Sequence, residues 1–337
     1  MTEQAGRLTV TPVHSHFGAR VEGIHLPDLS KDDPAAKELF DELVALQQEY
    51  SVLVLPDQRF VDERQMEFTK EWYGPLETQV GTIGTEARLH PNLADWSNVD
   101  PEGNGKLLSW SDQRMIYQSG NQVWHSDSSY KPVPAKYSLL SAREVPPSGG
   151  ETQFVSQRHG YETLPESLRR ELDDRIVVHS LLYSRSIVAK GLFRPEQERA
   201  IPPTRQSLVR TNPVNGRKGL FIGAHAWYIE DMPYQESRAL LDDLLARITT
   251  DDCVYEHRWT PGDLVIWDNR CVLHRGRTWD AARHRRVLRR TTVAGDGPTA
   301  EPTMATRTPE WDGIVPEGLG VEPAEVPTAA ADEVSAR

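Results

Sequence analysis

The sequence contains little cysteine, fewer positive than negative charges, and no long apolar run. Two of its 337 residues are cysteines, Cys253 and Cys271, which fits a reducing compartment better than a disulfide framework. The formal net charge of −12 argues against a nucleic-acid partner, because such a partner requires a basic face. No apolar stretch is long enough to span a bilayer, and the first ten residues lack the layout of a signal peptide. We therefore expect a cytoplasmic protein that binds neither nucleic acid nor membrane.

The composition is that of a folded protein with a sizeable core. Hydrophobic residues make up 38% of the chain and charged residues 26%, and the length fits one large domain. We expect this domain to span residues 1–297. Residues 298–337 are rich in Pro, Ala, Glu and Thr, a composition typical of a disordered tail.

The first third of the chain combines helices with strands. Leucines at helical spacing predict a helix over residues 33–50, with Asp33 as its cap before Pro34. An apolar run over residues 51–58 predicts a buried strand, and residues 64–74 predict a second helix. Residues 78–120 mix Gly, Asn, Asp and Trp. We expect them to form a long loop or lid with little regular structure.

After Asn121 the pattern changes to many short apolar stretches separated by Pro and Gly turns. These predict strands at KYSLLSAREV, TQFVSQ, SLVRTNP, KGLFIG, LVIWDN and VLRRTTVAG. Two helices are predicted between them, over residues 161–174 and 234–249. Many short strands with few helices favour a mostly β protein with flanking helices, an antiparallel barrel or sandwich.

The stretch NQVWHSDSSY, residues 121–130, carries a candidate metal site. In a strand, residues two apart point to the same face, so His125 and Asp127 would project together. His274, at the end of the apolar run in GDLVIWDNRCVLHRG, offers a third ligand. Two histidines and one carboxylate match the facial triad of non-haem Fe(II) oxygenases, which leaves positions for a chelating cosubstrate and dioxygen. The ordinary alternative is a solvated histidine beside an aspartate, which is common.

Arginines are concentrated in HRRVLRRTTV, residues 284–293. If this segment is a strand, Arg286 and Arg290 share one face, because they are four residues apart. Guanidinium groups bind carboxylates in a bidentate manner. The segment therefore predicts a site for anionic molecules, although one arginine in so basic a run could also be an ordinary surface residue.

Taken together, these stretches resemble a known family. The blocks NQVWHSDSSY, LLSAREVPPSGGETQF, LFIGAHA, VIWDNRCVLHRGRTWD and RRVLRRTT are similar to the taurine and 2,4-dichlorophenoxyacetate dioxygenase family, which uses Fe(II), 2-oxoglutarate and O2. The closer likeness is to its aryloxyalkanoate branch. The resemblance implies a double-stranded β-helix, the jelly-roll barrel. It also implies three ligands for Fe(II): His125, Asp127 and His274.

The resemblance assigns further roles around the iron. Arg286 matches the arginine that binds the distal carboxylate of 2-oxoglutarate, and Thr152 matches the hydroxyl that supports its other carboxylate. Asn121 matches an asparagine near the cosubstrate and the substrate. From the residues alone, Thr152 could be an ordinary strand threonine, and Asn121 could cap the following strand.

Three residues are assigned to the substrate. Arg290 matches the arginine that faces the anionic group of the substrate, and Ser129 aligns with a residue of the substrate pocket. His225, in GAHAW, has apolar neighbours and would by default be a core histidine, whereas the family block favours a place in the pocket wall.

The implied reaction is oxidative decarboxylation of 2-oxoglutarate coupled to hydroxylation of a small anionic substrate, with release of succinate and CO2. On an aryloxyalkanoate it would cleave the ether to a phenol. One departure puts the herbicide itself in doubt: TQVGTIG, residues 78–84, has no basic residue where the branch carries a lysine. The loops at 78–120 and 184–200 would decide the substrate.

Three alternatives remain open from the sequence. The same chemistry could act on a sulfonate, a sulfate ester or a biosynthetic intermediate. A zinc hydrolase could use the same three ligands with an added general base. A non-catalytic barrel could bind metal or 2-oxoglutarate only. Enzymes of this family are often dimers or larger, so a homo-oligomer is compatible with the resemblance.

Overall fold

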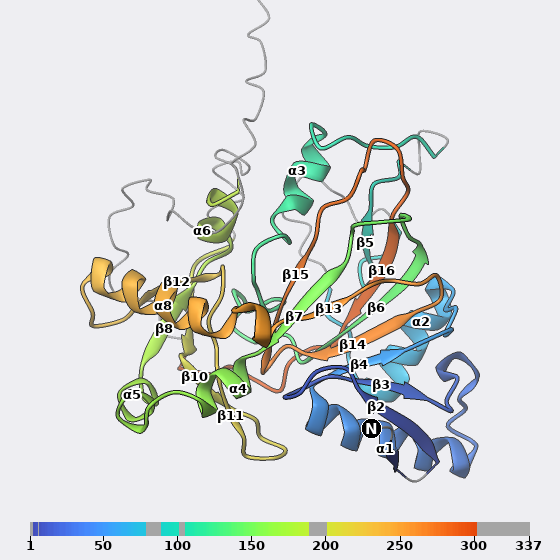
Figure 1. The fold of residues 1–337 in the computed structure, drawn as a ribbon, viewed down its shortest axis with the longest axis horizontal. Coiled ribbons are helices and arrows are strands. Elements are labelled where there is room, and N and C mark those ends of the chain that lie inside the picture. Colours follow the sequence, from blue (N-terminus) through green and yellow to red (C-terminus); the bar gives the residue numbers. More distant parts are fainter. Residues whose placement is uncertain (1–2, 6, 79–88, 101–104, 189–200, 302–337) are drawn as a thin grey trace, which may run out of the picture.

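The computed structural model describes residues 3–5, 7–78, 89–100, 105–188 and 201–301, and Figure 1 shows their arrangement. The largest unit is an eight-stranded sheet in the order β1-β2-β3-β4-β14-β6-β16-β5. All its neighbouring strands are antiparallel except β3 and β4. In chain order the strands are β1 (Glu3–Ala5), β2 (Leu8–Pro12), β3 (Ala19–Glu22), β4 (Val52–Leu55), β5 (Ala94–Ser97), β6 (Tyr137–Glu144), β14 (Leu264–Asp268) and β16 (Val287–Thr292).

A second, three-stranded sheet faces the first. It has the order β13-β7-β15, formed by Tyr255–His257, Thr152–Ser156 and Val272–Gly276. Side chains from both sheets share one buried apolar cluster, in which Val265 and Trp267 of β14 meet Phe154 of β7 and Val272 of β15. The candidate metal site lies at this junction of the two sheets.

The apolar run of β14 is explained by burial on both faces. Val265 and Trp267 point to the second sheet, whereas Leu264 and Ile266 belong to a separate cluster on the opposite face. Side chains alternate between the faces of a strand, so a strand covered on both sides must be apolar throughout. Strand β4 is buried at every position for the same reason, as its apolar run predicted.

Two helices cover the outer face of the large sheet (Figure 1). Helix α1 (Pro34–Tyr50) starts as predicted, because the Asp33 side chain accepts a hydrogen bond from the backbone N–H of Ala35. Helix α2 (Asp62–Phe68) continues into a π-helical turn, Thr69–Tyr73, which confirms the second predicted helix.

A third region packs beside the facing sheets. Its described part contains the sheet β12-β8-β9, the pair β10-β11 and four helices. The strands are β8 (Ile176–His179), β9 (Thr204–Ser207), β10 (Val209–Thr211), β11 (Lys218–Leu220) and β12 (Ala226–Ile229). The helices are α4 (Gln157–Glu162), α5 (Glu166–Leu172), α6 (Leu181–Ser186) and α8 (Tyr234–Ile248), and α8 is followed by a 3-10 turn at Asp251–Cys253. A second 3-10 turn, Leu26–Asp28, belongs to the part of the molecule around the large sheet.

The structure corrects two sequence-based expectations and adds detail to the predicted jelly-roll fold. The helix predicted over residues 161–174 is two helices, because Pro165 cannot continue a helix and disfavours helical backbone before it. The stretch 78–120 is not a loop throughout: it contains β5, which pairs with β16, and helix α3 (Gln113–Ser119). The described strands form facing sheets, with no ladder that closes them into a continuous barrel.

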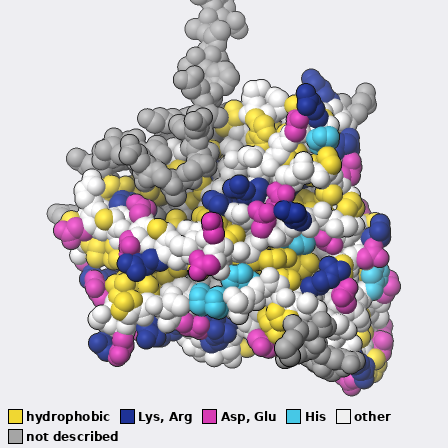
Figure 2. All heavy atoms as spheres, viewed as in Figure 1, with side chains coloured by type: hydrophobic (Ala, Val, Ile, Leu, Met, Phe, Trp, Pro, Cys, Tyr) yellow, Lys and Arg dark blue, Asp and Glu magenta, His cyan; other side chains and the backbone are white. Residues whose placement is uncertain are grey.

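The predicted tail and the predicted 184–200 loop lie only partly within the described residues. The first residues of the predicted tail pack on β9, where the Ser207 backbone N–H donates to Thr299 Oγ1 at 3.0 Å, and residues 302–337 lie outside the described part. Much of the predicted 184–200 loop also lies outside it. Among the described residues, no helix is both long and apolar enough to cross a membrane. Figure 2 shows acidic and basic side chains intermixed over one face.

Candidate metal centre and adjoining cavity

The three predicted metal ligands meet, but not in the way that the sequence suggested. His125 forms one isolated antiparallel bridge with His274 of β15, with backbone N···O distances of 3.1 and 2.9 Å. The chain then turns, and Ser128 has a positive φ of 56°. His125 and Asp127 are therefore not two residues of one strand, as we expected. The turn after the bridge, rather than strand alternation, returns the Asp127 carboxylate to the two imidazoles.

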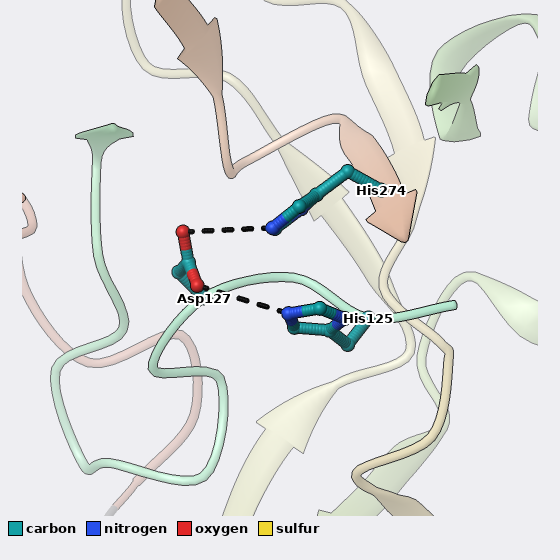
Figure 3. A group of neighbouring side chains, drawn as sticks. All are labelled: His125, Asp127 and His274. Carbon is teal, nitrogen blue, oxygen red and sulfur yellow. Dashed lines mark ion pairs between the residues drawn. The ribbon is translucent and has the colours of Figure 1, made fainter. Parts of the chain in front are cut away.

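Figure 3 shows the three side chains pointing toward one another. His125 Nε2 lies 3.9 Å from Asp127 Oδ1, and His274 Nε2 lies 3.8 Å from Asp127 Oδ2. One ligand atom from each residue lies within 4.8 Å of the others, and all three residues are buried. Two imidazole nitrogens and one carboxylate oxygen at this spacing can hold one divalent metal ion on a single face.

The protonation states suit metal binding. His125 Nδ1 lies 2.8 Å from the Val123 carbonyl, which can only accept, so Nδ1 carries the proton and the Nε2 lone pair is free. Burial lowers the pKa of His125 to about 4, although Asp127 opposes this effect. Burial, followed by the charge of His125, lowers the pKa of His274 well below its ordinary value. Neutral imidazoles are the form that binds metals.

Side chains that the sequence analysis did not single out hold Asp127 in place. Ser138 of β6 donates a hydrogen bond to Asp127 Oδ2 at 2.7 Å, and Asn269 Nδ2 donates to Ser138 Oγ at 2.9 Å. The Asn269 side-chain oxygen accepts from the Asp127 backbone N–H at 3.2 Å. The polar bend at Asp268–Arg270 was visible in the sequence, but its contact with Asp127 depends on the fold.

Arg290 of β16 pairs with the candidate metal ligand. Its Nη1 lies 2.5 Å from Asp127 Oδ1, and its guanidinium carbon lies 5.0 Å from the Trp96 ring centre. Burial alone would raise the pKa of Asp127, but Arg290 and the neighbouring polar groups lower it well below the ordinary range. The triad therefore presents a carboxylate and two neutral imidazoles.

A cavity opens beside His274 and contains four of the residues assigned to the cosubstrate and substrate: Asn121, Thr152, Arg286 and Arg290. The two arginines line the same cavity, although β16 begins at Val287 and Arg286 therefore lies just before the strand. The Arg286 guanidinium lies over Trp279 at 5.1 Å, and its Nε donates to the Gly150 carbonyl at 3.0 Å. No carboxylate among the described residues pairs with Arg286, and its burial lowers its pKa to about 10.

Gly150 makes room for Arg286. A Cβ atom at this position would lie 2.9 Å from both Cδ and Nε of Arg286, and the backbone has a φ of +73° that favours glycine. The pair Gly149-Gly150 was visible in the sequence as context for Thr152, but its contact with Arg286 was not.

Thr152 and Asn121 lie in the cavity wall with unused polar groups. Thr152 Oγ1 accepts a hydrogen bond from Trp259 Nε1 at 3.0 Å, which leaves its own O–H free to donate. The Asn121 carbonyl accepts from the Gly276 N–H at 2.8 Å, and its side-chain amide has no bonded partner among the described residues. A buried arginine, a hydroxyl donor and a metal ligand in one cavity can bind a dicarboxylate.

The last two assigned residues lie elsewhere in the site. His225 is buried beside His125, with 6.1 Å between ring centres, and its Nδ1 has no hydrogen-bond partner. Ser129 is fully buried behind the site, and its hydroxyl lies 2.9 Å from His179 Nδ1. The described cavity walls include neither of these residues, so their roles toward a substrate stay predictions.

Comparisons of the sequence with known proteins identify relatives among the 2-oxoglutarate-dependent dioxygenases. The family described as taurine catabolism dioxygenase TauD, TfdA family matches residues 9–292. The alpha-ketoglutarate-dependent 2,4-dichlorophenoxyacetate dioxygenase of Cupriavidus pinatubonensis is 41% identical over 290 residues, covering 85% of this chain and 98% of that protein. The (S)-phenoxypropionate/alpha-ketoglutarate-dioxygenase of Sphingobium herbicidovorans is 36% identical over 302 residues, covering 88% and 98% of the two chains.

A solved structure extends the likeness to the fold. The crystal structure of AAD-2 in complex with Mn(II) and N-oxalylglycine has a TM-score of 0.77 at 37% identity, covering 87% of this chain and 99% of that chain. This confirms the predicted jelly-roll fold and the predicted family. The chain therefore belongs to the TauD, TfdA family of dioxygenases, oxidoreductases that use Fe(II), 2-oxoglutarate and O2.

Proposed function

We propose that this enzyme hydroxylates a small aryloxyalkanoate-type carboxylate at the carbon that bears the ether oxygen. The hydroxylated product would collapse to a phenol and an oxo acid, while 2-oxoglutarate is converted to succinate and CO2. The names of the relatives, which are dichlorophenoxyacetate and phenoxypropionate dioxygenases, support this substrate class.

The roles of the site residues follow from their contacts. His125, Asp127 and His274 would hold Fe(II), which together with 2-oxoglutarate and O2 supplies the oxidation of a C–H bond. Arg286 would bind the distal carboxylate of 2-oxoglutarate, and the free O–H of Thr152 would donate to the other carboxylate. Asn121 would orient the bound molecules, and Arg290 would orient Asp127 and attract the substrate anion.

Substrate contacts on the other side of the iron are part of the same proposal. His225 lies next to His125, where it would form a wall of the substrate site. Ser129 would support that wall through its hydrogen bond to His179, because its own side chain is fully buried.

The observation that carries the proposal is Arg286, a buried cation without a carboxylate partner, in the cavity that His274 lines. A hydrolase with the same ligands would instead need a general base beside the metal. Among the described residues that line the cavity there is no Asp or Glu. The chemistry of the cavity therefore favours an anionic cosubstrate.

The test is oxygen consumption together with succinate detection. Anaerobically purified enzyme with Fe(II) and 2-oxoglutarate is challenged with aryloxyacetates, aryloxypropionates, taurine and alkyl sulfates, with His125→Ala as the control. We expect aryloxyalkanoates to stimulate succinate release and His125→Ala to abolish it. Stimulation by taurine or alkyl sulfates alone would replace the substrate class, and wild-type enzyme that fails to bind 2-oxoglutarate would contradict the role of Arg286.

We further propose that residues 1–297 form one catalytic domain that works in the cytoplasm, alone or as a homo-oligomer. Both cysteines are free, which fits a reducing compartment. Limited proteolysis should leave one core fragment that ends near residue 300. Light scattering on the purified enzyme measures its oligomeric state.

A further inference from the structure

Arg185, in helix α6, is a buried cation that the roles above do not use. Its side chain donates one hydrogen bond, from Nη1 to the Gly120 carbonyl at 3.2 Å, and its Nε has no partner. The residue is 5% exposed, and no carboxylate among the described residues forms an ion pair with it. A buried charge is costly unless a counter-charge satisfies it. Arg185 is therefore a buried cation that is available to bind an anionic ligand.

The position of Arg185 is next to the metal site. Its guanidinium packs directly on Gly120, where a Cβ atom would come within 2.5 Å of Nη1. Gln118, two residues before Gly120, and Asn121, directly after it, line the cavity beside His274. Burial is the main cause of the lowered pKa of His225, and the charge of Arg185 is the next one.

The surroundings of Arg185 are aromatic. Its guanidinium carbon lies 4.9 Å from the ring centre of Tyr117. Tyr117 and Tyr130 pack against the same small apolar cluster, and Tyr130 lies 5.0 Å from His225 between ring centres. A cation among aromatic rings fits a ligand that combines an aryl group with a carboxylate.

Three other arginines line the described cavity. Arg290 is paired with Asp127, Arg286 lies on the Trp279 side, and Arg277 is exposed to solvent. Among these arginines of the described residues, Arg185 is therefore the buried one that has no proposed role toward the triad or the cosubstrate.

We propose that Arg185 binds the carboxylate of the substrate directly on the His225 side of the metal, whereas Arg290, which is paired with Asp127, adds only long-range attraction. This inference rests on the proposed function, because it assumes a substrate with an anionic group. It makes Arg185 a specificity-determining residue, which selects carboxylates over neutral molecules of the same shape.

The test compares two ligands that differ in charge alone. Phenoxyacetate and the neutral phenoxyacetamide are titrated by anaerobic calorimetry into wild type, Arg185→Gln and Arg185→Lys, each loaded with Mn(II) and 2-oxoglutarate. Arg210→Gln is the matched control. Arg210 is also a buried arginine with an unbonded nitrogen, it lies 5.1 Å from the Phe221 ring, and it is not part of the site.

We expect Arg185→Gln to bind phenoxyacetate about 10- to 100-fold more weakly, with the affinities for phenoxyacetamide and 2-oxoglutarate unchanged. Arg185→Lys should lower the ratio of carboxylate to amide affinity by at least about threefold, because lysine lacks the planar fork of arginine. This decrease should be smaller than in Arg185→Gln, because lysine keeps the positive charge. Arg210→Gln should leave the ratio unchanged. If Arg185→Gln does not fold, the ratio for Arg185→Lys decides.

Each remaining outcome has one meaning. An unchanged ratio in the Arg185 variants, or an equal loss of both ligands, would overturn the inference and assign Arg185 a structural role. Wild type that binds phenoxyacetate without turning it over would contradict the proposed function, while the ratio still tests Arg185. Wild type that binds no aryloxy carboxylate would overturn both.

Discussion

At the residue scale, the hydroxyl of Ser138 fixes the orientation of the Asp127 carboxylate. It donates to Oδ2 at 2.7 Å and accepts from Asn269, so the carboxylate cannot turn freely between His125 and His274. Groups that orient a metal ligand typically account for about 10- to 100-fold in metal affinity. We predict that Ser138→Ala weakens Mn(II) binding by about tenfold, measured by titration of the metal-free enzyme.

Ser141 provides the matched control, because it is a buried serine of the same strand whose hydroxyl bonds Gln65 instead. Ser141→Ala should lose stability without a change in metal affinity. Equal metal affinities in the two variants would contradict the role of Ser138.

At the element scale, the turn before β7 makes space for Arg286. Alanine at Gly150 would place a Cβ atom 2.9 Å from Arg286 Cδ and Nε, so the guanidinium must shift from its place over Trp279. A displaced binding group loses much of its effect. We predict that Gly150→Ala raises the KM for 2-oxoglutarate by about tenfold, as measured by succinate release.

Gly216→Ala separates this effect from backbone strain. Gly216 has a similar φ of +69°, but nothing lies within 4 Å of a Cβ atom built there. Both variants should lose roughly 1–2 kcal/mol of unfolding free energy from the strained backbone. A raised KM in Gly216→Ala, or a normal one in Gly150→Ala, would show that contact with Arg286 is not the cause.

The same scale shows which elements the sequence can predict. Strands β4 and β14 were predicted because both of their faces are buried, so their apolar runs are unbroken. Strand β5 was missed, since ADWS has no such run and pairs only because β16 lies beside it. The turn that joins His125 to Asp127 was read as a strand, because the sequence does not show that the pairing with His274 stops after one bridge.

At the scale of the whole molecule, the candidate metal ligands were predictable from their residue types, whereas the hydrogen bonds around them were not. His125, Asp127 and His274 could be chosen because few residue types hold iron. Ser138, Asn269 and Arg185 are ordinary residue types, and only the facing sheets and helix α6 bring them to the site.

Acid stability is a property of the whole molecule to which several buried histidines contribute, and His179 is one of them. His179 is fully buried, and its Nε2 must carry the proton because it bonds the Phe221 carbonyl, whereas Nδ1 faces the Ser129 hydroxyl. Burial lowers the pKa of His179 to about 3. His225 is a nearby buried histidine whose pKa burial likewise lowers.

The sign of the pH effect follows from this lowered pKa. Between about pH 6.5 and pH 3, His179 binds a proton in the unfolded chain but not in the folded protein. The unfolding free energy therefore falls as the pH is lowered through this range. From pH 7.0 to 5.5 this one histidine should cost about 1.3 kcal/mol of unfolding free energy. His179→Gln keeps a donor for Phe221 but cannot titrate. Urea unfolding at both pH values should therefore show that the variant loses about 1.3 kcal/mol less unfolding free energy than the wild type. The other buried histidines contribute equally to both proteins. The same loss in both proteins would mean that the titration of His179 does not contribute to acid unfolding.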